Sequence, residues 1–301
     1  MAQNYGYQNE LDFVNLFNNK KLAELDENSQ LFLKDVFGDI FSYDEDIICW
    51  KNKMNQKADI FIKYKNYIKS ISLKCGKSNS IHTENIQDFR LYLEKLGIPY
   101  NVIEKYVSYH YGYMKDENGE TDFAKQLTSD EYKIFYQNEI DIFNNYINKS
   151  RIIVDMIDRF IVRGRNSDYD IDALVCGTVD NYVWIKKHDI YDLILSMKNF
   201  NHTSPHIACM TIGPKKRNIN RDSKNCRERY LVTIRWNFIR ECIVLFNCKL
   251  WWGSIILPSL SSHKKKRTLC SLYFFMERMR GIEPPSQPWQ GRILTIEPHS
   301  Q

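Results

Sequence analysis

Three residues on a predicted β-hairpin have the chemistry needed to hydrolyse a phosphodiester. Asp59 lies early in segment 58–64, and Lys74 lies late in segment 67–75 with Ser72 two residues before it. Mg²⁺ prefers hard oxygen ligands and typically takes one or two carboxylates, with water and phosphate completing its shell. A nearby lysine can orient or deprotonate the attacking water and neutralise charge that develops on the phosphate. Asp59 and Lys74 therefore have the types and separation that metal-assisted phosphodiester hydrolysis requires.

A turn at residues 65–66 would bring the two segments together as antiparallel strands. Side chains alternate between the two faces of a strand. Ser72 and Lys74 therefore share one face, and the aliphatic residues Ile71 and Leu73 lie on the other. Any half-exposed strand has this pattern, and a second interpretation stays open. In it, Asp59 forms a surface ion pair with Lys57 or Lys74, which contributes little to stability.

The hairpin residues resemble the PD-(D/E)XK nuclease superfamily, the fold of many type II restriction endonucleases. Ala58-Asp59 matches the P-D element, Ser72-Leu73-Lys74 matches (D/E)-x-K, and Glu10 on the first predicted helix matches an upstream acid. The resemblance covers residues 8–97. It implies an α/β fold with a restriction-endonuclease-like core, in which a central mixed β-sheet is flanked by helices. It also implies catalytic roles for Asp59, Ser72, Lys74 and Glu10, with Mg²⁺ as cofactor and DNA as substrate.

Serine at position 72 departs from the family pattern because it removes one carboxylate from the metal shell. A neutral hydroxyl is a weaker ligand than a carboxylate. Glu84, shortly after the second strand, is the nearest acid that could replace it, so the predicted metal ligands are Asp59, Glu10 and Glu84. The leading hypothesis is a Mg²⁺-dependent endonuclease acting on DNA, of restriction type. Ser72 supports the alternative, a catalytically inactive nuclease-fold protein that binds nucleic acid. A third hypothesis is an interaction protein whose hairpin is incidental.

Polar and basic loops supply candidate contacts to nucleic acid. One loop follows the hairpin, and two others, at 163–170 and 214–229, flank β-prone segments. Such side chains contact phosphates, although a solvated charged loop has the same composition. The predicted contacts are Lys77, Asn79, His82, Arg163, Arg165, Lys215, Lys216, Arg217 and Arg221. Asp168, Asp170 and Asp172 form a rival acidic cluster on a predicted strand.

Hydrophobic periodicity and turn residues predict alternating helices and strands. The predicted elements are a helix over 8–37, a strand over 47–50, the hairpin over 58–75, a helix over 86–97, mainly helix over 101–160, strands over 169–176 and 181–187, a helix over 189–197, and strands over 206–213 and 229–239. Residues 1–100 are predicted to form the nuclease-like core. Residues 101–245 would add a helical insert and a β-containing half that completes the domain or binds DNA.

The charge and pattern of the chain change towards its C-terminus. The net charge is +5 overall, but the segment from His206 onward has 17 Lys and Arg against six acids. Residues 246–301 lack a steady period, and RMRGIEPPS resembles tails produced by spurious read-through of a transfer-RNA gene. We therefore predict that 246–301 is non-native or disordered. A genuine basic tail that binds nucleic acid is the alternative.

Composition indicates a soluble, cytoplasmic protein. The chain has 301 residues, 43% of them apolar and 26% charged, which favours a packed core over disorder. No apolar run is long enough to cross a membrane, and the first residues do not resemble a secretory signal. The eight cysteines form no C-x-x-C pair, so we expect free thiols. Many restriction-type enzymes are dimers, so the resemblance leaves a homodimer open.

Overall fold

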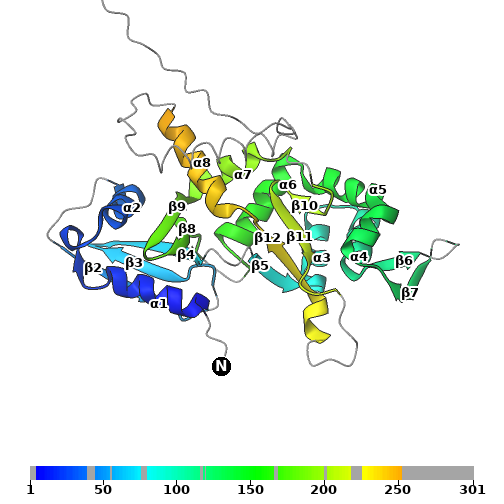
Figure 1. Cartoon of the computed structure of the whole chain (residues 1–301), viewed down its shortest axis with the longest axis horizontal. Helices are drawn as coiled ribbons and strands as arrows, with labels where there is room; N and C mark the ends of the chain where they lie inside the picture. The colour runs from blue at the N-terminus through cyan, green and yellow to red at the C-terminus, as the bar shows by residue number, and fades with distance from the viewer. Residues whose placement is uncertain are drawn as a thin grey trace, which may run out of the picture. The chain divides into compact units, whose positions relative to one another are not determined.

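The fold is organised around a mixed β-sheet that takes strands from both halves of the chain (Figure 1). The computed structural model describes residues 5–38, 45–54, 56–75, 80–115, 118, 120–165, 169–199, 202–217 and 226–252. Within these residues, the sheet has the order β1 (Lys20–Lys21), β2 (Asp46–Lys51), β3 (Ile60–Tyr64), β4 (Tyr67–Lys74), β8 (Ala173–Thr178), β9 (Asn181–Lys186). Only β4 and β8 are parallel among these neighbouring pairs. The predicted α/β class with a central mixed sheet flanked by helices is confirmed.

The β3–β4 hairpin forms where the sequence predicts it. Phe61 lies opposite Ser70, and Tyr64 lies opposite Tyr67 at the turn. Lys65 has φ 52°, which places it in the left-handed region that tight two-residue hairpin turns require. The register is therefore fixed by a short turn and by strand alternation.

One face of the hairpin packs against two N-terminal helices, α1 (Tyr5–Phe17) and α2 (Glu27–Phe37). Phe13 and Phe17 lie in the same core cluster as Ile60 and Ile71. The predicted single helix over 8–37 is wrong, because the chain turns after α1 and pairs as β1 with β2. The side chain of Asp26 then caps α2 by accepting the backbone N–H of Ser29 at 3.0 Å.

A second sheet lies beside the first within the described residues and has the order β10, β11, β12, β5 (Figure 1). Its strands are β10 (His206–Ile207), β11 (Met210–Pro214), β12 (Leu231–Arg235) and β5 (Ser80–Asn85). The sequence predicts a loop after the hairpin and no strand over 80–85, which is wrong, because Ser80–Asn85 forms β5. These residues pair with β12, about 150 positions later in the chain, with Glu84 opposite Val232.

Helices complete the large core around this second sheet. They are α3 (Ile86–Lys95), α4 (Tyr100–Tyr111), α5 (Ser129–Ile147), α6 (Ser150–Ile157) and α7 (Lys187–Ser196), and a π-helix (Asp158–Val162) continues α6. Short helical turns occur at Leu22–Glu24 and Cys226–Tyr230. A hairpin of β6 (Tyr113–Lys115) and β7 (Thr121–Gln126) interrupts the region predicted to be mainly helical.

The last described element is α8 (Ile239–Trp252), which packs on β8 and β9. Cys242 and Ile243 are buried in the core, and the side-chain amide of Asn247 donates to the carbonyl of Trp184 at 3.1 Å. The boundary predicted after residue 245 thus falls inside a packed helix. Residues 253–301, most of the predicted tail, lie outside the described residues. The described helices include none that is long and apolar enough to cross a membrane.

Candidate active site

Asp59 and Ser72 meet at the start of β3. The backbone N–H of Asp59 donates to the carbonyl of Ile71 at 2.9 Å, which extends the ladder between the two strands. Its Oδ2 accepts hydrogen bonds from the Ser72 hydroxyl at 3.0 Å and from the backbone N–H of Leu73 at 2.6 Å. Ser72 is fully buried and Asp59 is half-buried. The neighbouring strand therefore fixes the orientation of the carboxylate.

Lys74 lies on the same face of β4 as Ser72 and is half-buried. It forms no ion pair with any residue that the structure describes, and Asp59 likewise has no lysine or arginine within ion-pair distance in that part of the chain. The surface ion pair of the second interpretation is thus absent from the described residues. Within the described part of the chain, Oδ1 of Asp59 and the Lys74 ammonium have no hydrogen-bond or ion-pair partner.

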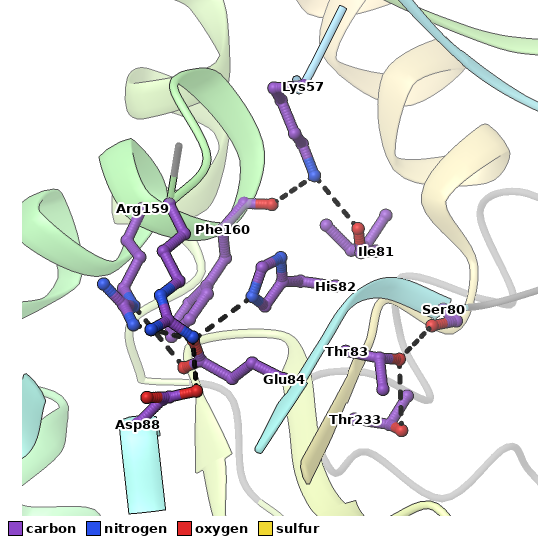
Figure 2. Close-up of polar contacts among 11 residues, drawn as sticks. Lys57, Ser80, Ile81, His82, Thr83, Glu84, Asp88, Arg159, Phe160 and Thr233 are labelled. Atoms are coloured by element: carbon purple, nitrogen blue, oxygen red, sulfur yellow. Dashed lines mark hydrogen bonds and ion pairs between the residues drawn. The ribbon is translucent and has the colours of Figure 1, made fainter. Parts of the chain in front are cut away.

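Lys57 is a neighbour whose contacts the sequence did not predict. Its Nζ donates to the carbonyl of Ile81 on β5 at 3.0 Å and to the carbonyl of Phe160 in the π-helix (Figure 2). Burial lowers the pKa of Lys57 well below its ordinary value; the charge of Lys74 lowers it further, while Asp59 opposes both effects. Its partners are 24 and 103 positions away, so only its adjacency to Asp59 was visible in the sequence.

Glu10 lies at the same end of the sheet but on the opposite face. α1 packs on the face that carries Ile60 and Ile71, whereas Asp59 and Ser72 alternate to the other side. The Glu10 carboxylate pairs with Lys51 at 2.5 Å. It makes no hydrogen bond with the hairpin site among the contacts of the described residues.

Glu84 belongs to a separate, buried charge cluster (Figure 2). Its carboxylate accepts a forked pair of hydrogen bonds from Arg159, at 2.7 and 3.4 Å. The His82 ring lies 3.5 Å from the same carboxylate, and burial lowers the pKa of that histidine although Glu84 opposes the shift. The described residues hold no group of three His, Cys, Asp or Glu side chains that could bind a metal ion. Glu10 and Glu84 pair with Lys51 and Arg159, so the three predicted metal ligands are not brought together within the described residues.

Two predicted phosphate-binding arginines lie on the loop after the π-helix. Arg163 pairs with Asp170 at 2.8 Å, and Arg165 pairs with Asp88. Their side chains are 54% and 47% exposed, so each guanidinium still presents donors to solvent. These two residues keep the exposure that a phosphate contact needs.

This loop lies directly against the candidate active site. Gly164 has φ 79°, and a Cβ built there would lie 3.2 Å from the Cβ of Lys57. The positive φ favours glycine at this position, and the short distance shows that the loop packs closely against Lys57. The contact brings Arg163 and Arg165 close to the chain segment that carries Asp59.

The predicted contacts of the second basic loop that the structure describes are already paired or packed. Lys215 and Lys216 both pair with Glu228, at 3.0 and 2.8 Å. Arg217 donates to the carbonyl of Tyr109 and lies 4.5 Å from the centre of that ring. Burial lowers the pKa of Arg217, which indicates a packed side chain rather than an exposed phosphate contact.

The rival acidic cluster is also neutralised where it is described. Asp170 pairs with two cations, and Asp172 pairs with one and accepts two hydrogen bonds from Ser70. The three cations are Arg163, Lys187 and Lys69. Four residues of the sequence-based predictions lie outside the described residues: Lys77, Asn79, Asp168 and Arg221.

A basic groove runs between α3 and the α6–π-helix segment. Two adjoining pockets of about 440 and 270 Å³ share Tyr92, Lys95 and Arg159 along their walls. The first also contains Arg151 and Arg163, and the second contains Arg165. Five cations thus line a concave surface that begins next to Lys57, and three aspartates offset part of their charge.

The geometry at Asp59 fits a divalent cation held by one carboxylate. Oδ2 accepts hydrogen bonds from Ser72 and Leu73, and Oδ1 of this half-buried side chain accepts none from any residue that the structure describes. Mg²⁺ commonly retains several waters and uses one or two carboxylates together with substrate phosphates. The arrangement can therefore place a metal-bound phosphate beside the Lys74 ammonium.

No family model and no curated protein matches the chain. Among solved structures, it is similar to restriction endonuclease MspI in complex with its cognate DNA. The sequence identity is 11% and the TM-score is 0.48, over 76% of this chain and 88% of that one.

Proposed function

We propose that the chain is a metal-dependent endonuclease that hydrolyses phosphodiester bonds in DNA, of restriction type. The observation that carries this proposal is that an oriented carboxylate and a lysine lie on one sheet face, and neither has an ion-pair partner among the described residues. Asp59 and Lys74 supply the two groups, and Ser72 fixes the first of them. Elsewhere in the described residues, the acids Glu10, Glu84 and Asp170 are already paired with cations.

In the proposed reaction, Oδ1 of Asp59 would hold Mg²⁺, with water and the scissile phosphate as further ligands. The ion, when bound, supplies Lewis acidity and a more acidic water. Lys74 would orient the attacking water or take its proton, and its charge would stabilise the phosphate as negative charge develops. Arg163 and Arg165 would hold the phosphate backbone at the mouth of the groove.

The test is cleavage of supercoiled plasmid by the full chain with Mg²⁺, with EDTA, and with the variant Lys74→Ala. Lys63→Ala is the matched control, because Lys63 lies on the same sheet face at the other end of the hairpin. We expect Mg²⁺-dependent cleavage, a loss of about 100-fold or more in Lys74→Ala, and no change in Lys63→Ala.

A second candidate function is nucleic-acid binding by an inactive nuclease fold. The observation that favours it is the single carboxylate at the site, since Ser72 stands where a second acid would strengthen metal binding. Folded protein that shifts DNA without cutting it would support this candidate. A protein with no affinity for DNA at low salt would contradict both.

A further inference from the structure

An open pocket lies on the outer face of the hairpin, beside the candidate active site. Its volume is about 580 Å³, which is in the range of small-molecule sites. Its walls combine aromatic and aliphatic side chains with a few polar groups. They include Trp50, Phe61, Ile68, Ser70, Arg163 and Tyr169.

Aromatic surface is presented to solvent in this pocket. The rings of Trp50 and Phe61 are stacked, with centroids 5.6 Å apart and planes 27° apart. Trp50, Ile68 and Tyr169 are 37%, 54% and 64% exposed. Large apolar side chains gathered in an open concavity indicate a binding surface rather than a random surface feature.

The polar groups of the pocket favour an uncharged, flat ligand. Asp170 and Asp172 also line it. However, Asp170 is already paired with Arg163 and Lys187. Asp172 is paired with Lys69 and accepts a hydrogen bond from the backbone N–H of Ser70. They therefore contribute little free negative charge. What remains is a π-surface with the partly exposed guanidinium of Arg163 at its edge.

The pocket lies on the same sheet face as the candidate active site, two residues further along the strands. Phe61 and Ser70 lie opposite each other on neighbouring strands, and each is two residues from Asp59 or Ser72 on the same face. At about 3.3 Å per residue, the pocket begins about 7 Å along the strands from the carboxylate. Arg163 lines both this pocket and the basic groove.

We propose that this pocket, the Trp50 pocket, takes one unstacked base of the nucleic-acid strand whose phosphate lies at Asp59. The inference rests on the proposed function and adds a substrate class, DNA with an unpaired base next to the scissile phosphate. Base–aromatic stacking is tolerant of sequence and accompanies phosphate contacts in proteins that bind single strands. The neutral aromatic wall would hold the base, while Arg163 would contact the adjoining phosphate.

The test compares two probes with two forms of the full chain. One probe is a DNA duplex carrying a single unpaired adenine, and the other carries an abasic residue at that position. Binding is measured by fluorescence anisotropy in EDTA at low salt, so that cleavage does not interfere. We expect wild type to prefer the adenine probe about 5- to 150-fold, the range of one base–aromatic stack. Trp50→Ala should lose this preference and Trp50→Phe should retain part of it.

Tyr67→Ala is the matched control, because Tyr67 is exposed on β4 and does not line the pocket. Equal weakening of both probes by Trp50→Ala would overturn base capture while leaving the proposed function intact. A change in oligomeric state in Trp50→Ala, measured by light scattering, would assign the face to a second copy instead. Loss of plasmid cleavage is a separate measurement, so failure of the proposed function is distinguishable.

Discussion

Two predicted metal ligands, Asp59 and Glu84, lie in very different environments. Asp59 holds one hydroxyl and one backbone N–H through a single oxygen and has no cationic partner among the described residues. Glu84 is 4% exposed and receives a forked pair of hydrogen bonds from Arg159, with His82 close by. Both belong to the polar set that a sequence-based prediction assigns to one metal site.

The difference distinguishes the proposed reactive site from a structural ion pair. A buried carboxylate with a bidentate arginine has its hydrogen-bonding capacity satisfied, and removing either partner leaves an uncompensated charge. A half-buried carboxylate with an open oxygen can exchange water for a ligand without breaking an existing ion pair. Asp59 is therefore the better candidate for the proposed chemistry, whereas Glu84 ties β5 to the π-helix through Arg159.

The largest expected effect is on cleavage by Asp59→Asn. Asparagine can still accept hydrogen bonds from Ser72 and Leu73, but its amide nitrogen replaces the oxygen proposed to bind the metal. We expect plasmid cleavage to fall by about 10²- to 10⁴-fold, with the melting temperature unchanged. Cleavage rates and thermal denaturation by circular dichroism check both parts. Cleavage within a few-fold of wild type would remove the basis for assigning chemistry to this cluster.

Glu84→Ala should show the opposite pattern. The variant removes the carboxylate partner of Arg159, whose side chain is 16% exposed, and breaking a buried pair in this way typically costs about 3–5 kcal/mol of unfolding free energy. Urea denaturation measures the loss. Glu94→Ala is the control, since Glu94 pairs with Arg90 at a more exposed position and should cost about 1 kcal/mol or less. A stable Glu84→Ala protein that no longer cleaves DNA would reverse the two assignments.

Acid should destabilise the core around α4, where His110 is buried and its ring nitrogen lies 2.8 Å from the carbonyl of Arg229. Burial lowers the pKa of His110 to about 4, from an ordinary value near 6.5. The unfolded state therefore takes up a proton at a pH where the folded state does not, and the unfolding free energy falls as pH drops from about 6.5 towards 4. At about 1.4 kcal/mol per pKa unit, His110 contributes on the order of 3 kcal/mol to this loss.

Urea denaturation at pH 7 and pH 4.5 tests the acid sensitivity. His110→Gln should reduce the difference between the two stabilities, because the substituted side chain does not titrate. His188→Gln serves as the control, since that histidine is largely exposed. An unchanged pH difference in His110→Gln would show that other groups cause the acid sensitivity.

Ser72→Ala should have a smaller effect, because it removes one of two hydrogen bonds that orient Asp59. The N–H of Leu73 still holds the same oxygen at 2.6 Å. We expect a loss of about 1 kcal/mol in stability and a loss of about tenfold or less in cleavage. Rates and denaturation curves for the purified variant provide the measurement. A loss as large as that of Asp59→Asn would instead make the hydroxyl a direct participant.

The contrast between the clusters also explains what the sequence could predict. Asp59, Ser72 and Lys74 lie within one hairpin, so alternation and a two-residue turn were enough to place them on one face. Glu84 depends on β12, about 150 residues later, and on Arg159, 75 residues away. No local pattern encodes such long-range partners, and the same holds for the carbonyl partners of Lys57. The sequence therefore predicted which side chains share a strand face, but not which partner each charged side chain contacts.

The smallest expected effect distinguishes the arginines of the groove from structural arginines. Arg163 exposes about half of its side chain, so it can neutralise one phosphate and release one counterion. We expect Arg163→Ala to weaken DNA binding a few-fold at low salt and to reduce the slope of log affinity against log salt by about one. Anisotropy titrations at several salt concentrations measure the slope. Arg90→Ala is the control, because Arg90 pairs with Glu94 and Glu104 and does not line the groove pockets. If both variants leave the slope unchanged, DNA does not follow this groove, and the phosphate contacts must come from another surface of the chain.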